Sequence, residues 1–166
     1  THMDAPWHYA PTMNGGERAR TIDEMPMEWC MGNGVCLHFQ DKPDGYKVTA
    51  ADLEAYFKSI DYQPKPLDIV LLHTGAQKNY GRPEYGVTGC GVGREATLWL
   101  LRQGIKVVGT DAWSWDVPLP LEALWEAVRW ALKPNGAALF FAQCPYDKIL
   151  GASNLAMLRY EWIWYK

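Results

Sequence analysis

The sequence predicts an α/β fold, and three observations lead to that fold class. Two almost continuous apolar runs, at 68–73 and 105–109, are typical of buried strands in a parallel sheet. Amphipathic helices are predicted at 49–60 and 94–103. Along 94–111 the order is helix, glycine, apolar strand and acidic residue, which is typical of α/β units whose function lies at the carboxyl ends of strands.

The N-terminal half begins with a long segment that shows no helix or strand period. Residues 1–30 are rich in Pro, Gly, Met and Trp, and we expect an ordered loop. A short strand is predicted at 34–39, and the turn residues at 41–45 end it. In the helix at 49–60, Thr49 is the expected N-cap, with Asp52 as its capping-box partner.

The strand at 68–73 is expected to be buried on both faces and to lead into a glycine-rich loop at 74–92. Gly104 is the expected cap of the helix at 94–103, and the strand at 105–109 leads to Asp111. The remaining sequence predicts a helix at 121–132, a strand at 137–142 and an aromatic tail at 155–165 that packs against the domain. The length of 166 residues, with 48% hydrophobic residues, fits one domain over 1–166.

Charge and composition exclude several classes of function. The net charge is −3 and there is no basic run, so no nucleic-acid partner is expected. No apolar run reaches the roughly 18 residues of a membrane span, and no signal-peptide pattern is present. The four cysteines are scattered without CxxC spacing and are expected to be reduced thiols, so we expect a cytoplasmic protein.

Three side chains near the start of the chain form a candidate metal cluster. His2, Asp4 and His8 lie within seven residues, and Pro6 stiffens the backbone between them. Imidazole and carboxylate groups are ligands that zinc and manganese accept. A nearby imidazole that does not bind the ion could transfer protons. On spacing alone, a solvated loop that carries incidental histidines is the favoured interpretation over a metal site.

The sequence around this cluster resembles a known family. Residues 1–8 read THMDAPWH, similar to the core of the motif H-x-G-T-H-x-D-x-P-x-H, which marks the cyclase-like metal hydrolases. That family includes bacterial kynurenine formamidases and isatin hydrolases. Segments 22–26, 68–75 and 95–116 resemble the family in the same order, the last through its ending Asp-x-x-Ser-x-Asp. The resemblance covers residues 1–118.

The resemblance implies both a fold and a reaction. The fold would be the swivelling β/β/α fold of the family without its N-terminal strands. The reaction would be hydrolysis of a C–N bond in a small aryl amide, formamide or lactam by water activated on Zn²⁺ or Mn²⁺. His2 and Asp4 would be metal ligands, and His8 would be the proton shuttle, or a further ligand as in some members. Asp111 and Ser114 would lie near the substrate pocket. Family members often associate, which implies a homodimer or higher homo-oligomer.

Several departures from the family pattern bear on activity. The first His of the motif would precede residue 1, and residues 1–2 could themselves be left over from cloning. The family's C-terminal ligand pair is a His and a Glu twelve residues apart. Asp147 takes the Glu position as a third metal ligand, but Asn135 takes the His position. Residues 119–166 otherwise match poorly. The alternatives are therefore a degenerate member that acts as a binding or assembly protein, or a site completed across a dimer.

Other features have simpler explanations that we weigh beside the functional ones. His38 is expected to be a core or edge histidine, and His73 a structural histidine in preference to a pocket residue. The segment 89–93 (GCGVG) is only superficially a phosphate loop, because no strand precedes it, and Cys90 has no His beside it. The remaining candidates are aromatic and could form either a wall for a planar substrate or plain core: Trp7, Trp113 and Trp115.

Overall fold

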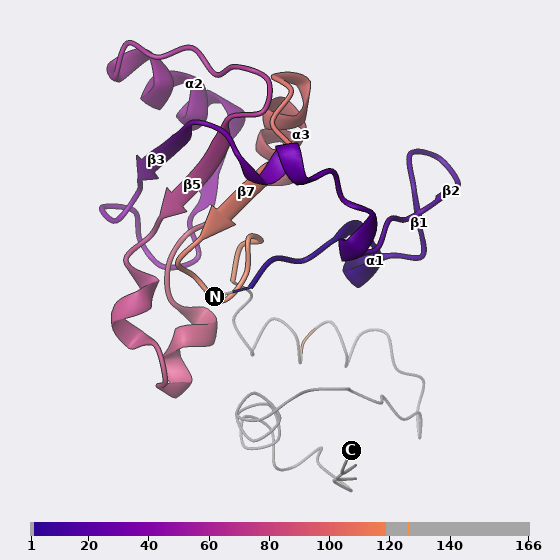
Figure 1. Cartoon of the computed structure of the whole chain (residues 1–166). Coiled ribbons are helices and arrows are strands. Elements are labelled where there is room, and N and C mark those ends of the chain that lie inside the picture. The colour runs from indigo at the N-terminus through magenta and orange to yellow at the C-terminus, as the bar shows by residue number, and fades with distance from the viewer. Residues whose placement is uncertain (1, 119–125, 127–166) are drawn as a thin grey trace, which may run out of the picture.

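Three parallel strands form the main sheet of the structure, a computed structural model that describes residues 2–118 and 126. The strand order is β3 (Gly34–His38), β5 (Ile69–His73) and β7 (Val107–Thr110). All three strands therefore end at one edge of the sheet, as Figure 1 shows. The predicted α/β class and the strands at 34–39, 68–73 and 105–109 are confirmed, with ends shifted by one or two residues.

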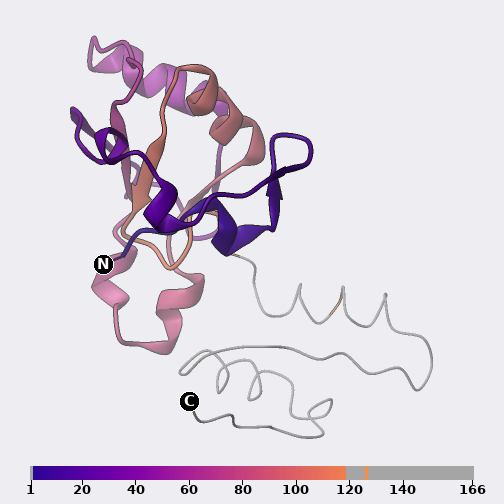
Figure 2. The ribbon, with the colours of Figure 1, turned by 45° about the vertical axis from the view of Figure 1, so that its right-hand side comes forward.

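Two helices cover one face of this sheet, as both ribbon views show (Figures 1 and 2). They are α2 (Ala50–Ser59) and α3 (Arg94–Arg102). The predicted cap of α2 is confirmed, because the Thr49 hydroxyl accepts from the Asp52 backbone N–H and the Asp52 carboxylate accepts from the Thr49 N–H. The core between helices and sheet includes Leu37, Leu53, Phe57, Val70, Leu72, Val92, Ala96, Leu100 and Ile105.

The opposite face of the sheet is open along the described chain. Cys36 and Leu71 are register partners on that face, and the side chain of Leu71 is 42% exposed although β5 is the central strand. The prediction that the strand at 68–73 is buried on both faces is therefore wrong for this face. Side chains alternate between the two faces of a strand, so Val70 and Leu72 point toward the helices α2 and α3 and are buried, whereas Leu71 points to the opposite face.

The N-terminal segment is more structured than the expected loop. It contains α1 (Pro6–Tyr9) and a small antiparallel hairpin of β1 (Thr12–Met13) and β2 (Glu17–Arg18). Asn14 and Gly15 both have positive φ, at 48° and 81°, so the Asn-Gly pair makes the hairpin turn. Two 3₁₀ turns follow, at Ile22–Glu24 and Met27–Cys30.

A second pair of parallel strands contacts the loop that follows β7 and holds it in place. The pair is β4 (Lys47–Val48) and β6 (Gly91–Val92). The Val92 N–H donates to the Trp115 carbonyl at 2.8 Å. A Cβ on Gly91 would lie 2.3 Å from the backbone of Asp116, so only glycine lets the loop approach this closely.

The predicted loop at 74–92 contains β6 and also two 3₁₀ helices, at Ala76–Asn79 and Pro83–Val87. None of the helices found among residues 2–118 has the length and apolar character needed to cross a bilayer. Three predicted elements lie outside the described residues: 121–132, 137–142 and 155–165.

Candidate metal and substrate site

The N-terminal motif segment brings two of the predicted metal ligands together. The Nε2 atom of His2 lies 3.4 Å from the Oδ2 atom of Asp4, and both side chains are accessible to solvent. Pro6 begins helix α1, as its fixed φ favours, and His8 lies in the last turn of this short helix. Both ribbon views show the segment passing close to the carboxyl end of β7 (Figures 1 and 2).

The separation of this pair suits two ligands of one ion. Bonds of about 2.0–2.1 Å at the tetrahedral angle place two ligand atoms about 3.3–3.4 Å apart. The observed 3.4 Å between His2 and Asp4 matches that value. Within residues 2–118 and 126, no group of three or more His, Cys, Asp or Glu side chains could hold a metal ion. The third predicted ligand, Asp147, lies outside the described residues, as does Asn135.

Tyr9 lies beside Asp4 of the motif segment, and sequence reasoning missed it. Its pKa is raised by partial burial of the hydroxyl, by the charges of Asp4 and Asp116, and by a hydrogen bond to Asp4. The ring of His8 meets the ring of Tyr9 edge-on, with centroids 5.1 Å apart. The only signal in the sequence was the position of Tyr9 directly after the motif.

The carboxylate of Asp111 accepts hydrogen bonds from the chain that follows β5. Its Oδ1 atom accepts from the Thr74 backbone N–H at 2.6 Å and the Thr74 hydroxyl at 2.9 Å, and its Oδ2 atom accepts from the Gly75 N–H at 2.8 Å. Burial opposes ionisation, but these hydrogen bonds and one from Gln77 outweigh it and keep the pKa below its ordinary value. The carboxylate ties the end of β5 to the end of β7.

The other predicted pocket residues lie on the loop after β7 and on α1. The side chains of Trp7 and Trp113 are about half exposed, and Trp113 meets Tyr85 edge-on at 6.0 Å. The Ser114 hydroxyl accepts from the Asp116 N–H at 3.3 Å. Trp115 packs against the core and donates to the Thr97 hydroxyl at 3.0 Å. Trp115 is therefore a core residue, whereas the side chains of Trp7 and Trp113 are accessible to a ligand.

Two histidines meet at the carboxyl edge of the sheet. The Nδ1 atoms of His38 and His73 are 3.2 Å apart. On the other side of the His73 ring, Nε2 lies 3.3 Å from the Gln77 side-chain nitrogen and 3.8 Å from the Asp111 carboxylate. Sequence reasoning missed this pairing, although each histidine ends an apolar run, because strand register cannot be read from one strand alone.

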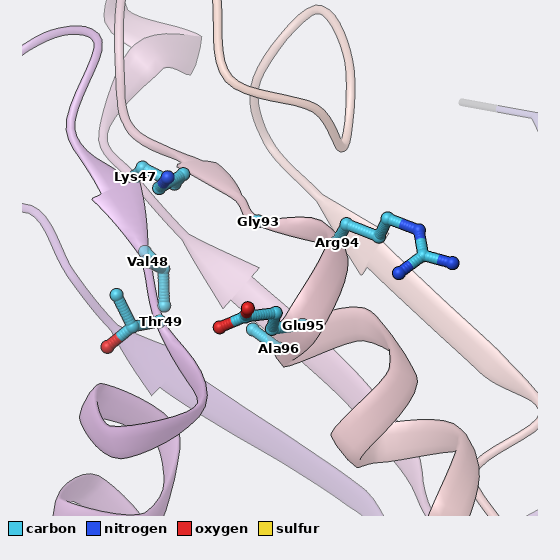
Figure 3. A pocket seen from close by; sticks show the side chains of 7 residues that line it. All are labelled: Lys47, Val48, Thr49, Gly93, Arg94, Glu95 and Ala96. Atoms are coloured by element: carbon cyan, nitrogen blue, oxygen red, sulfur yellow. The ribbon is translucent and has the colours of Figure 1, made fainter.

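Two further features carry no site. A hollow of about 250 Å³ lies between the starts of α2 and α3, but Figure 3 shows the Glu95 carboxylate in it and Arg94 turned away. The Glu95 carboxylate offsets the charge of Lys47, which also lines the hollow, so no binding preference for an anion results. Cys90 is buried, and burial raises its pKa to about 11, which leaves the thiol unreactive.

Comparison with known proteins connects this geometry to a family. The model of the Cyclase family, described as "Putative cyclase", matches residues 1–117. That range contains the motif segment, the main sheet and the loop after β7. Searches of curated proteins and of solved structures each gave no match. Since the family model covers well over half of the sequence, the chain belongs to the cyclase family.

Proposed function

We propose that this chain carries a metal-dependent hydrolase site that cleaves the C–N bond of a small aryl amide, formamide or lactam. The observation that carries the proposal is the His2–Asp4 pair, whose 3.4 Å separation suits one ion, inside a segment that matches the cyclase family. Kynurenine formamidase and isatin hydrolase activities are the two specific forms of this reaction that the motif suggests.

His2 Nε2 and Asp4 Oδ2 would hold the ion, Zn²⁺ or Mn²⁺, and Asp147 is the proposed third ligand. When bound, the ion lowers the pKa of a water molecule and polarises the substrate carbonyl. Tyr9, through its hydrogen bond to Asp4, would orient that carboxylate.

His8 is the proposed proton shuttle. Its side chain is exposed in the last turn of α1, four residues after Asp4, which leaves the imidazole available to a substrate. Water adds its oxygen to the carbonyl carbon, the C–N bond breaks, and His8 passes the proton taken from water to the leaving nitrogen. Trp7 and Trp113 offer accessible aromatic faces for a planar aryl group, and Asp111 and Ser114 would fix the loop that carries Trp113.

The test removes the metal with a chelator and, separately, the His8 imidazole by substitution. The full chain is dialysed against a chelator and reloaded with Zn²⁺ or Mn²⁺, and hydrolysis of formylkynurenine and of isatin is followed. We expect activity only in the reloaded protein, and a loss of about 10²-fold or more in kcat for His8→Ala. Tyr9→Phe keeps the ring beside His8 and serves as the matched control, with a smaller loss. Activity that ignores the chelator would contradict the proposal.

A second candidate function is a binding or assembly role without catalysis, in a homodimer or higher homo-oligomer. It is favoured by Asn135 at the position where the family has a His. Metal analysis of the native protein beside the double variant His2→Ala/Asp4→Ala decides between the two functions. Equal metal content in the two proteins after growth with added metal, together with no hydrolysis, would support the binding role.

A further inference from the structure

His38 and His73 form a pair of imidazoles on the open face of the main sheet. They are register partners at the ends of β3 and β5, and therefore their side chains share one face. His38 is exposed, and the side chain of His73 is 25% exposed. The His38 backbone N–H donates to the Tyr56 hydroxyl at 3.0 Å, which holds the end of β3 in place.

The two ring nitrogens that face each other are both Nδ1, 3.2 Å apart, with ring centroids 5.3 Å apart. In the neutral pair only one of them can carry the hydrogen that bridges the gap. We propose that a divalent late transition metal ion, Zn²⁺, Ni²⁺ or Cu²⁺, takes the place of that hydrogen and is bound by His38 Nδ1 and His73 Nδ1.

The geometry needs only a small adjustment to accept the ion. Metal–nitrogen bonds of about 2.0–2.1 Å at the tetrahedral angle require the two nitrogens to be about 3.3–3.4 Å apart. The pair is already at 3.2 Å, so the rings open by a few tenths of an ångström. The displaced hydrogen moves to the Nε2 atom of the ring that carried it, and no proton is released because both rings stay neutral.

The groups behind His73 would attract a cation. Its Nε2 atom lies 3.8 Å from the Asp111 carboxylate, which Thr74 and Gly75 hold in place. The side-chain nitrogen of Gln77 lies 3.3 Å from the same Nε2 atom, so this amide has to turn and present its oxygen when Nδ1 binds the ion and Nε2 carries the hydrogen. Histidines that bind metal through one nitrogen usually donate the other N–H to a carboxylate or carbonyl.

This site is separate from the His2–Asp4 pair and does not depend on the proposed hydrolysis. The described residues bring no third His, Cys, Asp or Glu ligand to either pair, so water would complete the coordination. Imidazole pairs suit late divalent ions, with Cu²⁺ bound more tightly than Zn²⁺. Ca²⁺ and Mg²⁺, which prefer oxygen ligands, should not compete.

The experiment uses the full chain, freed of metal, and two independent readouts. Equilibrium dialysis counts bound Zn²⁺, and long-range proton–nitrogen NMR reports the protonation of each histidine nitrogen. We expect His38→Gln and His73→Gln each to lose one equivalent of zinc, whereas Lys58→Gln, an exposed substitution outside both sites, loses none. We also expect zinc to shift both Nδ1 resonances and leave hydrogen on both Nε2 atoms.

Unchanged stoichiometry in both variants, or Nδ1 resonances that zinc does not move, would overturn the proposal and leave a hydrogen-bonded pair only. His38 is exposed, so His38→Gln should fold even if His73→Gln does not, and circular dichroism checks this. The double variant His2→Ala/Asp4→Ala separates the sites. It should lose any hydrolytic activity and keep the zinc at His38 and His73.

Discussion

Replacing Asp111 by alanine should destabilise the fold by about 3 kcal/mol. The carboxylate accepts two backbone N–H groups, from Thr74 at 2.6 Å and Gly75 at 2.8 Å, in addition to the Thr74 hydroxyl. Thr74 is only 6% exposed, so water cannot easily replace the lost acceptor. Hydrogen bonds to a charged group contribute about 1.5–3 kcal/mol each, and the lower value for each of two backbone donors gives about 3 kcal/mol.

Asp111→Asn is the matched variant, because it keeps the size of the side chain and one acceptor oxygen. It should cost about half as much, about 1.5 kcal/mol. The folded-state pKa of Asp111 is depressed, so its ionised form stabilises the fold above the unfolded pKa of about 3.9. That stabilisation is lost as the pH falls through the folded pKa. The difference between the native protein and Asp111→Asn should therefore shrink in acid.

The assay is urea unfolding of the native protein and both variants at neutral pH and near pH 3, followed by circular dichroism. The native m-value should be retained, since the surface exposed on unfolding is unchanged. A loss below about 0.5 kcal/mol for Asp111→Ala, or an Asp111→Asn difference that is equal at both pH values, would refute the assignment of Asp111 as the tie between β5 and β7.

Three further predictions concern packing, capping and thiol reactivity. Gly91→Ala should lower the free energy of unfolding, in thermal or urea unfolding, by at least about 2 kcal/mol, because its Cβ would lie 2.3 Å from the Asp116 backbone. Gly34→Ala is the control: a Cβ there would have nothing within 4 Å, and the loss should be under about 1 kcal/mol. Equal losses would show that the loop after β7 moves freely. Thr49→Ala should cost about 1 kcal/mol through loss of the α2 cap, and Thr49→Ser should restore most of it. Cys90 should resist iodoacetamide in the folded protein while the exposed Cys30 and Cys36 react, as peptide mass mapping can show; labelling at equal rates would contradict its burial.

Local signals in the sequence predicted the elements that local physics decides. The capping pair of Thr49 and Asp52 marked the start of α2, since a cap is a contact over three residues. The apolar runs marked β5 and β7 because buried strands need continuous apolar residues. The Asn14–Gly15 turn carried an equally local signal that the expectation of a plain loop overlooked.

The candidate site also has features that the sequence predicted and features that it did not. The spacing of His2, Asp4 and His8 singled them out, and the resemblance of their segment to a known motif indicated the family, which is confirmed over residues 1–117. The 3.4 Å approach of His2 to Asp4 concerns neighbours in the sequence, so the motif could anticipate it.

Only the tertiary structure decided the contacts between residues far apart in the chain. Asp111 and Thr74 are 37 residues apart, and His38 and His73 are 35 apart, yet each pair is within hydrogen-bonding distance. These contacts depend on the register of β3, β5 and β7, which is set by packing across the whole sheet. The sequence by itself thus determined the fold class and the motif at the N-terminus, whereas strand register decided that two histidines and Asp111 meet at one edge of the sheet.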